Sequence, residues 1–405
     1  MRAFKAILTS LVFAAIRGVA DEHLLDRFHD ALSFNAFDAT LRGQVSGLAD
    51  LEGYFFNRPA PGLLYTDKDS LISPRLTTFL DLQIGPSLYL FVQGRVDRGF
   101  DPADAALEAR ADEYALRYTP WDDGRFNVQV GKAGSVTSQW ASRHLSWENP
   151  FITGPLAYEH RTAVSDEEIA ASVKEFLNHS SAEEQEYTPI VWGPAYGTGA
   201  SAAGRIGKFD YAAEIKNTAL SARPSSWDAT EVGFDHPTLA TRLGFRPNVM
   251  WNLGIAASDG AYLRPEAFYE LPANTGIGDF HQRFLAQDIS FAWHRWQLWA
   301  EFIENRFEVP NVGNADVFGY FLEAKYKICP HLFGAIRWNQ QYYGSLRDDA
   351  GRSRPWDGDL SRVDLAVGYR PTPHTQIKVQ ASFSHERGSE NGIDHLLAAQ
   401  FTVRF

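Results

Sequence analysis

The sequence contains few groups of residues that could carry out nucleophilic chemistry. Ser384-His385-Glu386 and His179-Ser180-Ser181 each place a hydroxyl beside an imidazole, the pair that a hydrolytic nucleophile and its general base require. Adjacent side chains of an extended strand point to opposite faces, so Ser384 and His385 are not expected to pair with each other. The sequence therefore predicts a protein that is not an enzyme, although an enzyme built on the fold predicted below stays open as an alternative.

Metal, nucleotide and redox chemistry are equally poorly supported. The 12 histidines show no paired ligand spacing such as H-E-x-x-H. The glycine-rich stretch 197–204 lacks the G-x-G-x-x-G spacing, the following helix and the downstream acid of a dinucleotide site. The single cysteine, Cys329, excludes an internal disulfide bond, and a net charge of −12 disfavours nucleic acid as a partner. We expect no metal and no cofactor.

The elements that must position any site are strands. From about residue 41 onward, segments of roughly ten residues alternate apolar and polar side chains, which gives each strand one apolar face. The last segment is the clearest example, since its apolar face holds Leu397, Ala399, Phe401, Val403 and Phe405. This period of two predicts an all-β fold.

Alternation alone does not decide whether the apolar faces meet in a dry core or face lipid. The sequence has no stretch of about 20 apolar residues, so any membrane-spanning structure must be a closed barrel. The alternative is a soluble periplasmic β-sandwich that binds carbohydrate through some of its 11 tryptophans.

The lengths of the connections favour the barrel. Short turns are expected at 85–86, 122–124, 207–208, 246–248, 294–295, 329–330 and 370–373, and they alternate with longer polar connections near 58–70, 99–105, 135–196, 220–237, 260–281, 308–316, 344–358 and 388–393. A barrel inserted from one side keeps its long loops on the far side. We therefore predict a transmembrane antiparallel up-and-down β-barrel of about 16 strands over residues 41–405.

Aromatic residues and the two chain ends agree with that prediction. Tryptophans and tyrosines near strand ends would form an aromatic girdle, namely Trp251, Trp293, Trp296, Trp299, Trp338, Tyr326 and Tyr369. A last strand that ends on Phe405 resembles the signal that the outer-membrane assembly machinery reads. Residues 1–20 are predicted to be a signal peptide, with an apolar run before Gly18-Val19-Ala20. Residues 21–40 are expected to form a short periplasmic or interface helix.

At this point the chain resembles the sixteen-stranded bacterial porins, and most nearly the phosphate-selective group. The residues that carry the resemblance run from Tyr114 to Pro120 and from Phe126 to the Gly131-Lys132 pair. The Ala133-Gly134-Ser135 that follows departs from the pattern of that group, so a phosphate preference does not follow. The resemblance implies a homotrimer, a bacterial outer-membrane location, and passive diffusion of small hydrophilic solutes or ions through a water-filled lumen.

The connection 135–196 follows the fifth strand, where porins carry a third loop that folds into the lumen. Ser165 and Glu168 form a capping-box pattern that predicts a short helix over residues 165–178. We expect this constriction loop to lie against the glycine-rich strand 197–204, and its charged groups are Arg143, His144, Glu148, Asp166, Glu167 and Glu168. An external cap and a disordered loop are the alternatives.

If the apolar faces point to lipid, the opposite faces line the lumen. The charged residues expected there include Arg42, Arg75, Arg95, Arg242, Arg337, Lys325, Arg362, Lys378, Glu323 and Asp364. The loop acids are predicted to face the wall arginines across the pore. Outer-membrane lipid and lipopolysaccharide of a Gram-negative bacterium would surround the barrel, and the identity of the solute stays open.

Overall fold

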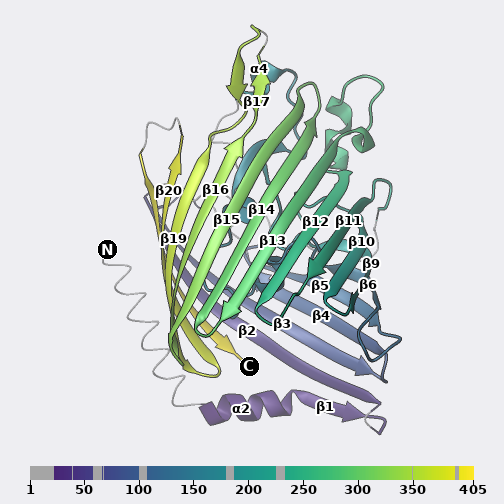
Figure 1. Ribbon diagram of the computed structural model, residues 1–405, viewed down its shortest axis with the longest axis vertical. Coiled ribbons are helices and arrows are strands. Elements are labelled where there is room, and N and C mark those ends of the chain that lie inside the picture. Colours follow the sequence, from purple (N-terminus) through teal and green to yellow (C-terminus); the bar gives the residue numbers. More distant parts are fainter. Residues whose placement is uncertain are drawn as a thin grey trace.

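The alternating segments of the sequence form long antiparallel strands, and each strand pairs with its neighbours in the chain (Figure 1). The computed structural model describes residues 22–38, 40–57, 66, 68–99, 107–178, 187–224, 233–348, 350–387 and 392–405. The predicted signal peptide, residues 1–20, lies outside these residues.

Sixteen strands close into a barrel, in agreement with the fold predicted from the sequence. They are β2 (Leu41–Phe56), β3 (Ser70–Ile84), β4 (Leu88–Asp97), β5 (Glu108–Tyr118), β6 (Asn127–Ala133), β9 (Gly197–Ile206), β10 (Phe209–Lys216), β11 (Thr238–Phe245), β12 (Trp251–Ala261), β13 (His281–Trp293), β14 (Trp296–Val309), β15 (Gly313–Cys329), β16 (Leu332–Tyr343), β19 (Leu360–Thr372), β20 (Thr375–Glu386) and β21 (Asp394–Arg404).

Closure takes place along β2. Residues Leu48–Phe56 of β2 pair with β21. Residues Leu41–Gln44 of β2 pair with the short strand β1 (Ser33–Ala36). Gly47 lies between the two regions and exchanges backbone hydrogen bonds of 3.0 and 3.1 Å with Phe405, whose ring covers the position that a Cβ would occupy. Helix α2 (Glu22–Ala31) precedes β1, as the sequence predicts for this segment.

The predicted short turns all join neighbouring strands at the lower end of Figure 1, and most long connections lie at the opposite end. The connection predicted at 308–316 is the exception, because only Pro310, Asn311 and Val312 separate β14 from β15. Asn311 adopts a φ of 59° and Gly313 a φ of 108°, backbone conformations that allow so tight a turn. The other long connections carry the hairpin β17 (Ser345–Arg347) and β18 (Ser353–Pro355) and the 3₁₀ turns η3 (Pro265–Glu270) and η4 (Ile277–Asp279).

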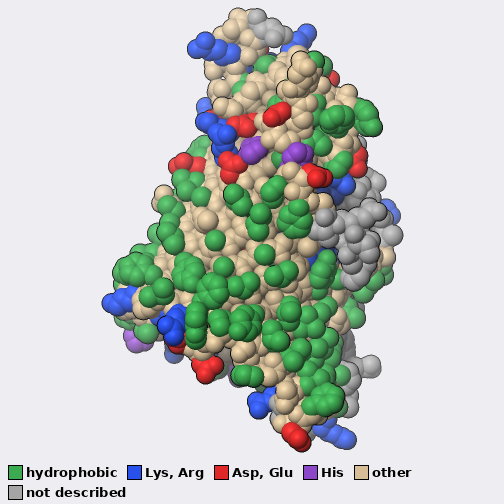
Figure 2. Space-filling view, turned by 90° about the vertical axis from the view of Figure 1, so that its right-hand side faces the viewer, with side chains coloured by type: hydrophobic (Ala, Val, Ile, Leu, Met, Phe, Trp, Pro, Cys, Tyr) green, Lys and Arg blue, Asp and Glu red, His purple; other side chains and the backbone are tan. Residues whose placement is uncertain are grey.

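The outer surface carries a band of apolar side chains. Leu322, Ile336, Leu365 and Val367 are exposed on it, and Figure 2 shows hydrophobic side chains spread over the middle of one face with charged groups above and below. Toward the short-turn end, the ring centroids of Trp296 and Tyr326 lie 4.7 Å apart. In the described part of the chain, no helix has the length and apolar character needed to span a bilayer.

Candidate functional site

The connection between β6 and β9 has structure of its own. It contains the 3₁₀ turn η1 (Ala141–Arg143), α3 (Leu156–Glu159), β7 (Arg161–Ser165), α4 (Val173–Phe176) and β8 (Tyr187–Pro189), and β7 pairs with β8. We call residues 135–196 the long loop.

The helix of the long loop is shorter than the sequence predicts. The Ser165 side chain accepts hydrogen bonds from the backbone N–H groups of Glu167 and Glu168 at 3.2 and 3.0 Å, as a helix cap would. The chain then leaves the helical path, because the Glu270 carboxylate holds the Ile169 N–H at 3.0 Å. The helix α4 begins only after Ser172, whose side chain accepts from the Glu175 N–H.

The long loop lies inside the barrel and is attached to the wall through its backbone. The ammonium group of Lys378, on the lumen face of β20, donates to the carbonyls of Ser146, Asn149 and Phe151 at 2.8, 2.9 and 2.9 Å. Lys378 is completely buried. A lysine expected to line the pore therefore anchors the loop instead.

Two arginines on neighbouring strands act in the same way. Arg337 on β16 donates to the Gly154 carbonyl at 2.8 Å and to the carboxylate of Asp364 at 2.8 Å. Arg362 on β19 binds Glu159 of the loop at 2.6 Å. Asp364 also lies 3.1 Å from Arg362, so its carboxylate pairs with both guanidinium groups. The two arginines are buried behind the loop.

Amide side chains complete the attachment. The Gln380 oxygen accepts from the Ile152 N–H at 2.6 Å, and the Asn339 oxygen accepts from the Leu156 N–H at 3.2 Å. The Arg143 guanidinium, on the loop, lies 2.6 Å from Glu323 of β15.

The expectation that the loop lies against residues 197–204 is wrong. Its hydrogen-bonded anchors are on β13, β14, β15, β16, β19 and β20, and its first residues Ser135 and Val136 bind Glu214 of β10. Gly199 of β9 instead accommodates the neighbouring strand, because an added Cβ there would overlap the Ile215 carbonyl.

One side of the lumen is filled by buried side chains, most of them apolar. Phe284, Ile303, Phe307 and Phe321 point inward from β13, β14 and β15 and pack against loop residues such as Tyr158.

Trp299 belongs to this side as well, since the Arg143 guanidinium lies 4.3 Å from its ring centroid. Its prediction as a girdle residue is therefore wrong, while Trp251, Trp293, Trp296, Trp338 and Tyr369 are exposed on the outside.

The opposite side of the lumen remains open. A cavity of about 220 Å³ separates the loop from β2, β3, β4 and β5, and its lining includes Arg75, Arg95 and Arg110 from the wall and His144 and Trp192 from the loop. We call it the upper cavity.

Carboxylates hold the guanidinium groups of the upper cavity in place. Arg75 binds Asp50 at 3.1 Å and also Glu52, and Arg95 lies 3.0 Å from Asp112. The side chains of Arg75 and Arg95 are 23 and 12 % exposed, whereas Asp50, Glu52 and Asp112 are 1, 3 and 0 % exposed. Asp97 also pairs with Arg110, so four carboxylates stand against the three arginines Arg75, Arg95 and Arg110. Of these seven groups, Arg75, Arg95 and the 13 % exposed Asp97 reach the cavity, whereas the Arg110 side chain is 1 % exposed.

A second cavity of about 720 Å³, the lower cavity, lies on the other side of the loop. It shares His144, Leu145 and Pro194 with the upper cavity and also exposes Arg242 and Arg246. Arg242 is held by Asp288 at 2.8 Å and by Asp210 at 2.9 Å. The three shared residues, His144, Leu145 and Pro194, line both cavities, and we call them the narrow point.

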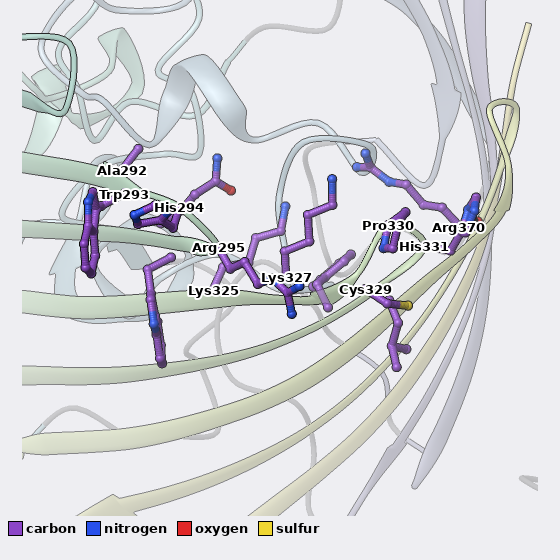
Figure 3. Close-up of a pocket in the computed structure, with 14 residues that line it drawn as sticks. Ala292, Trp293, His294, Arg295, Lys325, Lys327, Cys329, Pro330, His331 and Arg370 are labelled. Atoms are coloured by element: carbon purple, nitrogen blue, oxygen red, sulfur yellow. Dashed lines mark hydrogen bonds between the residues drawn. The ribbon is translucent and has the colours of Figure 1, made fainter.

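A third cavity, of about 450 Å³, lies at the short-turn end and is shown in Figure 3. Lys325 and Lys327 extend from β15 in the same direction, and Arg295 and Arg370 come from neighbouring strand ends. Among the described residues, those that line this cavity include no carboxylate.

His144 is the titratable group at the narrow point. Its Nε2 lies 3.0 Å from the Tyr196 hydroxyl and its Nδ1 lies 2.5 Å from the Ala141 carbonyl. Burial and the nearby Arg95 guanidinium lower the pKa of His144 to about 4. The imidazole is therefore neutral at pH 7.

The remaining predicted residues lie away from the narrow point. Arg42 is exposed near the short-turn end of β2, and Glu148 is exposed on the loop. Glu167 pairs with Arg264 of the β12–β13 connection, and Asp166 is buried beside the same connection. The loop acids thus contact a loop arginine and not the wall arginines, and Glu168 is exposed.

Sequence reasoning missed three charged residues that line the upper cavity, Asp50, Asp97 and Arg110, and two carboxylates that pair with its arginines, Glu52 and Asp112. Asp50 and Glu52 share the lumen face with Arg42 by simple alternation, so the pattern contained the signal. Asp112 sits at a register shift opposite Gln93 and Gly94, and simple alternation does not reveal such a bulge.

The residues considered for enzymatic and metal chemistry can be located only in part. Within them, no group of three or more His, Cys, Asp or Glu side chains is arranged to hold a metal ion. Ser384 and His385 are successive residues of β20, and the His385 Nδ1 lies 3.4 Å from the Gly392 carbonyl. The other candidate, His179 to Ser181, lies outside the described residues.

Comparison with known proteins identifies the fold. No protein family and no curated protein matches the sequence. Solved structures do match. The anion-selective porin from Comamonas acidovorans matches with a TM-score of 0.57 and 11 % identity, over 90 % of this chain and 100 % of that chain. Outer-membrane expressed OmpT of Vibrio cholerae and the outer-membrane channel DcaP of Acinetobacter baumannii each match with a TM-score of 0.56 and 10 % identity over 92 % of this chain, and over 100 % and 99 % of their own chains. The expected outer-membrane location agrees with these neighbours, and the chain has the closed sixteen-stranded barrel fold of outer-membrane proteins.

Proposed function

We propose that the chain is an outer-membrane porin through which small hydrophilic solutes diffuse passively, with a preference for anions. The observation that carries the proposal is the position of the long loop, which is fixed to one wall and leaves a polar path along the other. That path joins the upper and lower cavities at His144, Leu145 and Pro194. A narrow path lined by charged groups within a closed wall is the arrangement that selects ions.

The anion preference rests on which charges reach the water. In the upper cavity the guanidinium groups of Arg75 and Arg95 are partly exposed while Asp50, Glu52 and Asp112 lie behind them. Asp97, 13 % exposed, is the carboxylate of comparable exposure among the groups that pair with these arginines. Lys325 and Lys327 extend the cationic lining to the short-turn mouth. Fields inside a narrow low-dielectric channel raise the local concentration of ions of the opposite sign.

The membrane placement rests on the outer surface. Trp296 and Glu304 mark the two limits of the apolar band on β14. Eight residue steps at about 3.3 Å cover roughly 26 Å along a strand, or about 20 Å along the axis at a tilt of about 40°. This height is close to the apolar band of outer-membrane barrels, and the long connections then face the cell exterior.

Planar bilayer recordings test the function directly. The purified protein should give discrete conductance steps in KCl, and a tenfold KCl gradient should give a reversal potential whose sign reports that chloride permeates faster than potassium. Absence of steps from correctly folded protein would contradict the pore, and potassium selectivity would contradict the anion preference. A sample that migrates faster in detergent gels before heating than after it verifies that the barrel is folded.

A further inference from the structure

Two phenylalanines lie on the lumen face of the wall that the long loop leaves free. Phe79 of β3 and Phe91 of β4 line the lower cavity, and their ring centroids lie 6.2 Å apart with the ring planes 21° from parallel. Each ring lies opposite a polar residue of the neighbouring strand, Phe79 opposite Gln93 and Phe91 opposite Asp81. Apolar side chains on a lumen face run against the alternation that builds the wall, and such patches mark binding surfaces.

The packing of the chain does not account for the two rings. Both phenylalanines are only partly buried. In the described part of the chain, neither ring belongs to a buried hydrophobic cluster, whereas Phe284, Ile303 and Phe321 on the opposite side of the lumen do. The apolar surface of Phe79 and Phe91 therefore faces the water of the lower cavity.

Groups that donate and groups that accept hydrogen bonds line the same cavity. Arg246 binds Asp210 through Nε at 3.0 Å, and its Nη1 and Nη2 have no partner among the described residues. Gln139 donates to Ser290 at 3.0 Å, and its amide oxygen accepts from no described residue. Glu113 adds a carboxylate. The cavity of about 720 Å³ lies within the range of small-molecule sites, about 300–1,000 Å³.

The cations of the lower cavity are already paired. Arg242 and Arg246 are held by the carboxylates of Asp210 and Asp288, so two positive charges stand against two negative ones. Glu113 adds one further negative charge. Among the described lining residues and their ion-pair partners, positive charge is therefore not in excess, and the lower cavity suits a neutral solute.

A sugar ring combines the two features that the cavity offers. One face of a pyranose carries C–H groups, whose slightly positive hydrogens complement the negative face of an aromatic ring. Its hydroxyl groups both donate and accept hydrogen bonds. A simple ion would gain nothing from the phenylalanines, and a hydrocarbon would gain nothing from the polar groups.

We propose that the lower cavity binds a neutral saccharide, with one sugar ring against Phe79 and Phe91. The hydroxyl groups of that saccharide bind Arg246, Gln139 and Glu113. The proposal deepens the proposed function and rests on it, because a solute reaches the lower cavity only if the barrel is a pore.

Block of the ion current by sugars tests the proposal on the full chain in planar bilayers. The probes are maltose, cellobiose and sucrose, and sorbitol, which has hydroxyl groups but no ring, is the control solute. At least one disaccharide should reduce the wild-type current in a saturable manner, at a concentration at least about tenfold below that of sorbitol. The factor is expected because burial of about 55 Å² of apolar surface raises an affinity roughly tenfold.

Variants of the two rings make the test specific. Phe79→Ser/Phe91→Ser should raise the half-blocking sugar concentration by the same factor, whereas Phe79→Tyr/Phe91→Tyr keeps both rings and should be blocked like wild type. The matched control Phe37→Ser/Trp121→Ser replaces exposed aromatic residues beyond the strand ends and should also behave like wild type. Faster gel migration before heating than after it verifies that each variant is folded.

Three outcomes would overturn the proposal. They are a wild-type current that no disaccharide reduces more than sorbitol does, unchanged sugar block in the folded serine variant, and stronger block by benzoate than by every disaccharide, which would mean a site for aromatic anions. Conductance steps in KCl without sugar report the pore separately. A protein that gives steps but is not blocked refutes the saccharide site alone, and a folded protein without steps refutes the proposed function.

Discussion

Arg95 on β4 and Arg110 on β5 lie directly opposite each other in the lumen wall and bind the same carboxylate, that of Asp112, at 3.0 and 2.8 Å. Two like charges in register would destabilise the sheet. The register shift opposite Gln93 adds one residue to β5 and places Asp112 beside both guanidinium groups. The bulge thus lets two arginines lie side by side in the lumen wall.

Replacing that carboxylate should destabilise the barrel. The substitution Asp112→Asn leaves Asp97 as the remaining carboxylate shared by Arg95 and Arg110. Because it removes one partner of a buried ion pair, we expect it to cost about 3–5 kcal/mol. Urea unfolding in detergent measures the loss. Asp123→Asn, in an exposed turn where Asp123 pairs with Arg125 at 2.9 Å, is the control and should cost less than about 1 kcal/mol.

Removing the exposed cations should change selectivity. In Arg75→Gln/Arg95→Gln, the ratio of chloride to potassium permeability should fall about fivefold, because about 1 kcal/mol of favourable interaction with a passing anion is lost. Reversal potentials in a KCl gradient give the ratio. Arg125→Gln, whose side chain is 55 % exposed in a turn, should leave it unchanged. An unaltered ratio in the double variant would show that these arginines do not set selectivity.

Releasing the loop should widen the path. Lys378→Met keeps the length of the side chain but leaves the carbonyls of Ser146, Asn149 and Phe151 without their donor. A loop with fewer anchors should give a single-channel conductance at least about 1.5 times that of wild type and noisier open states, since buried unpaired carbonyls favour local opening. Lys208→Met, at an exposed turn, is the control, and equal conductance of both variants would contradict the anchoring role.

Protonation of the His144 imidazole at low pH should change the charge at the narrow point. Its pKa is lowered to about 4 by burial and by Arg95, so the imidazole stays neutral down to that pH. An unfolded loop would take up the proton near its ordinary value of about 6.5, so the folded arrangement loses stability as the pH falls from about 6.5 to about 4. Below about 4 the added positive charge should raise the chloride preference.

Recordings between pH 7 and pH 3 of wild type and His144→Gln separate this effect from the titration of carboxylates. The transition with a midpoint near pH 4 should be absent from the variant. If both proteins show the same pH profile, His144 is not the group responsible.

Much of the fold follows from the sequence, because period-two alternation and the order of short and long connections are local properties. The β14–β15 connection was mispredicted because a tight turn around Asn311 contains polar residues just as a long loop does. The position of the long loop could not be predicted from local patterns. It depends on contacts such as Lys378 to Phe151, more than 200 positions apart. For the same reason, alternation places Lys378 on the lumen face but does not reveal that the loop buries it.

The double pairing of β2 has a consequence for assembly. This strand is the first of the sixteen to be synthesised, yet its partner over Leu48–Phe56 is β21, the last. Until β21 pairs with it, β2 presents a long edge of unsatisfied backbone groups, and a partly formed sheet has a second such edge at its last strand. Because no earlier strand pairs with this part of β2, the chain is open to edge-to-edge association until the barrel closes.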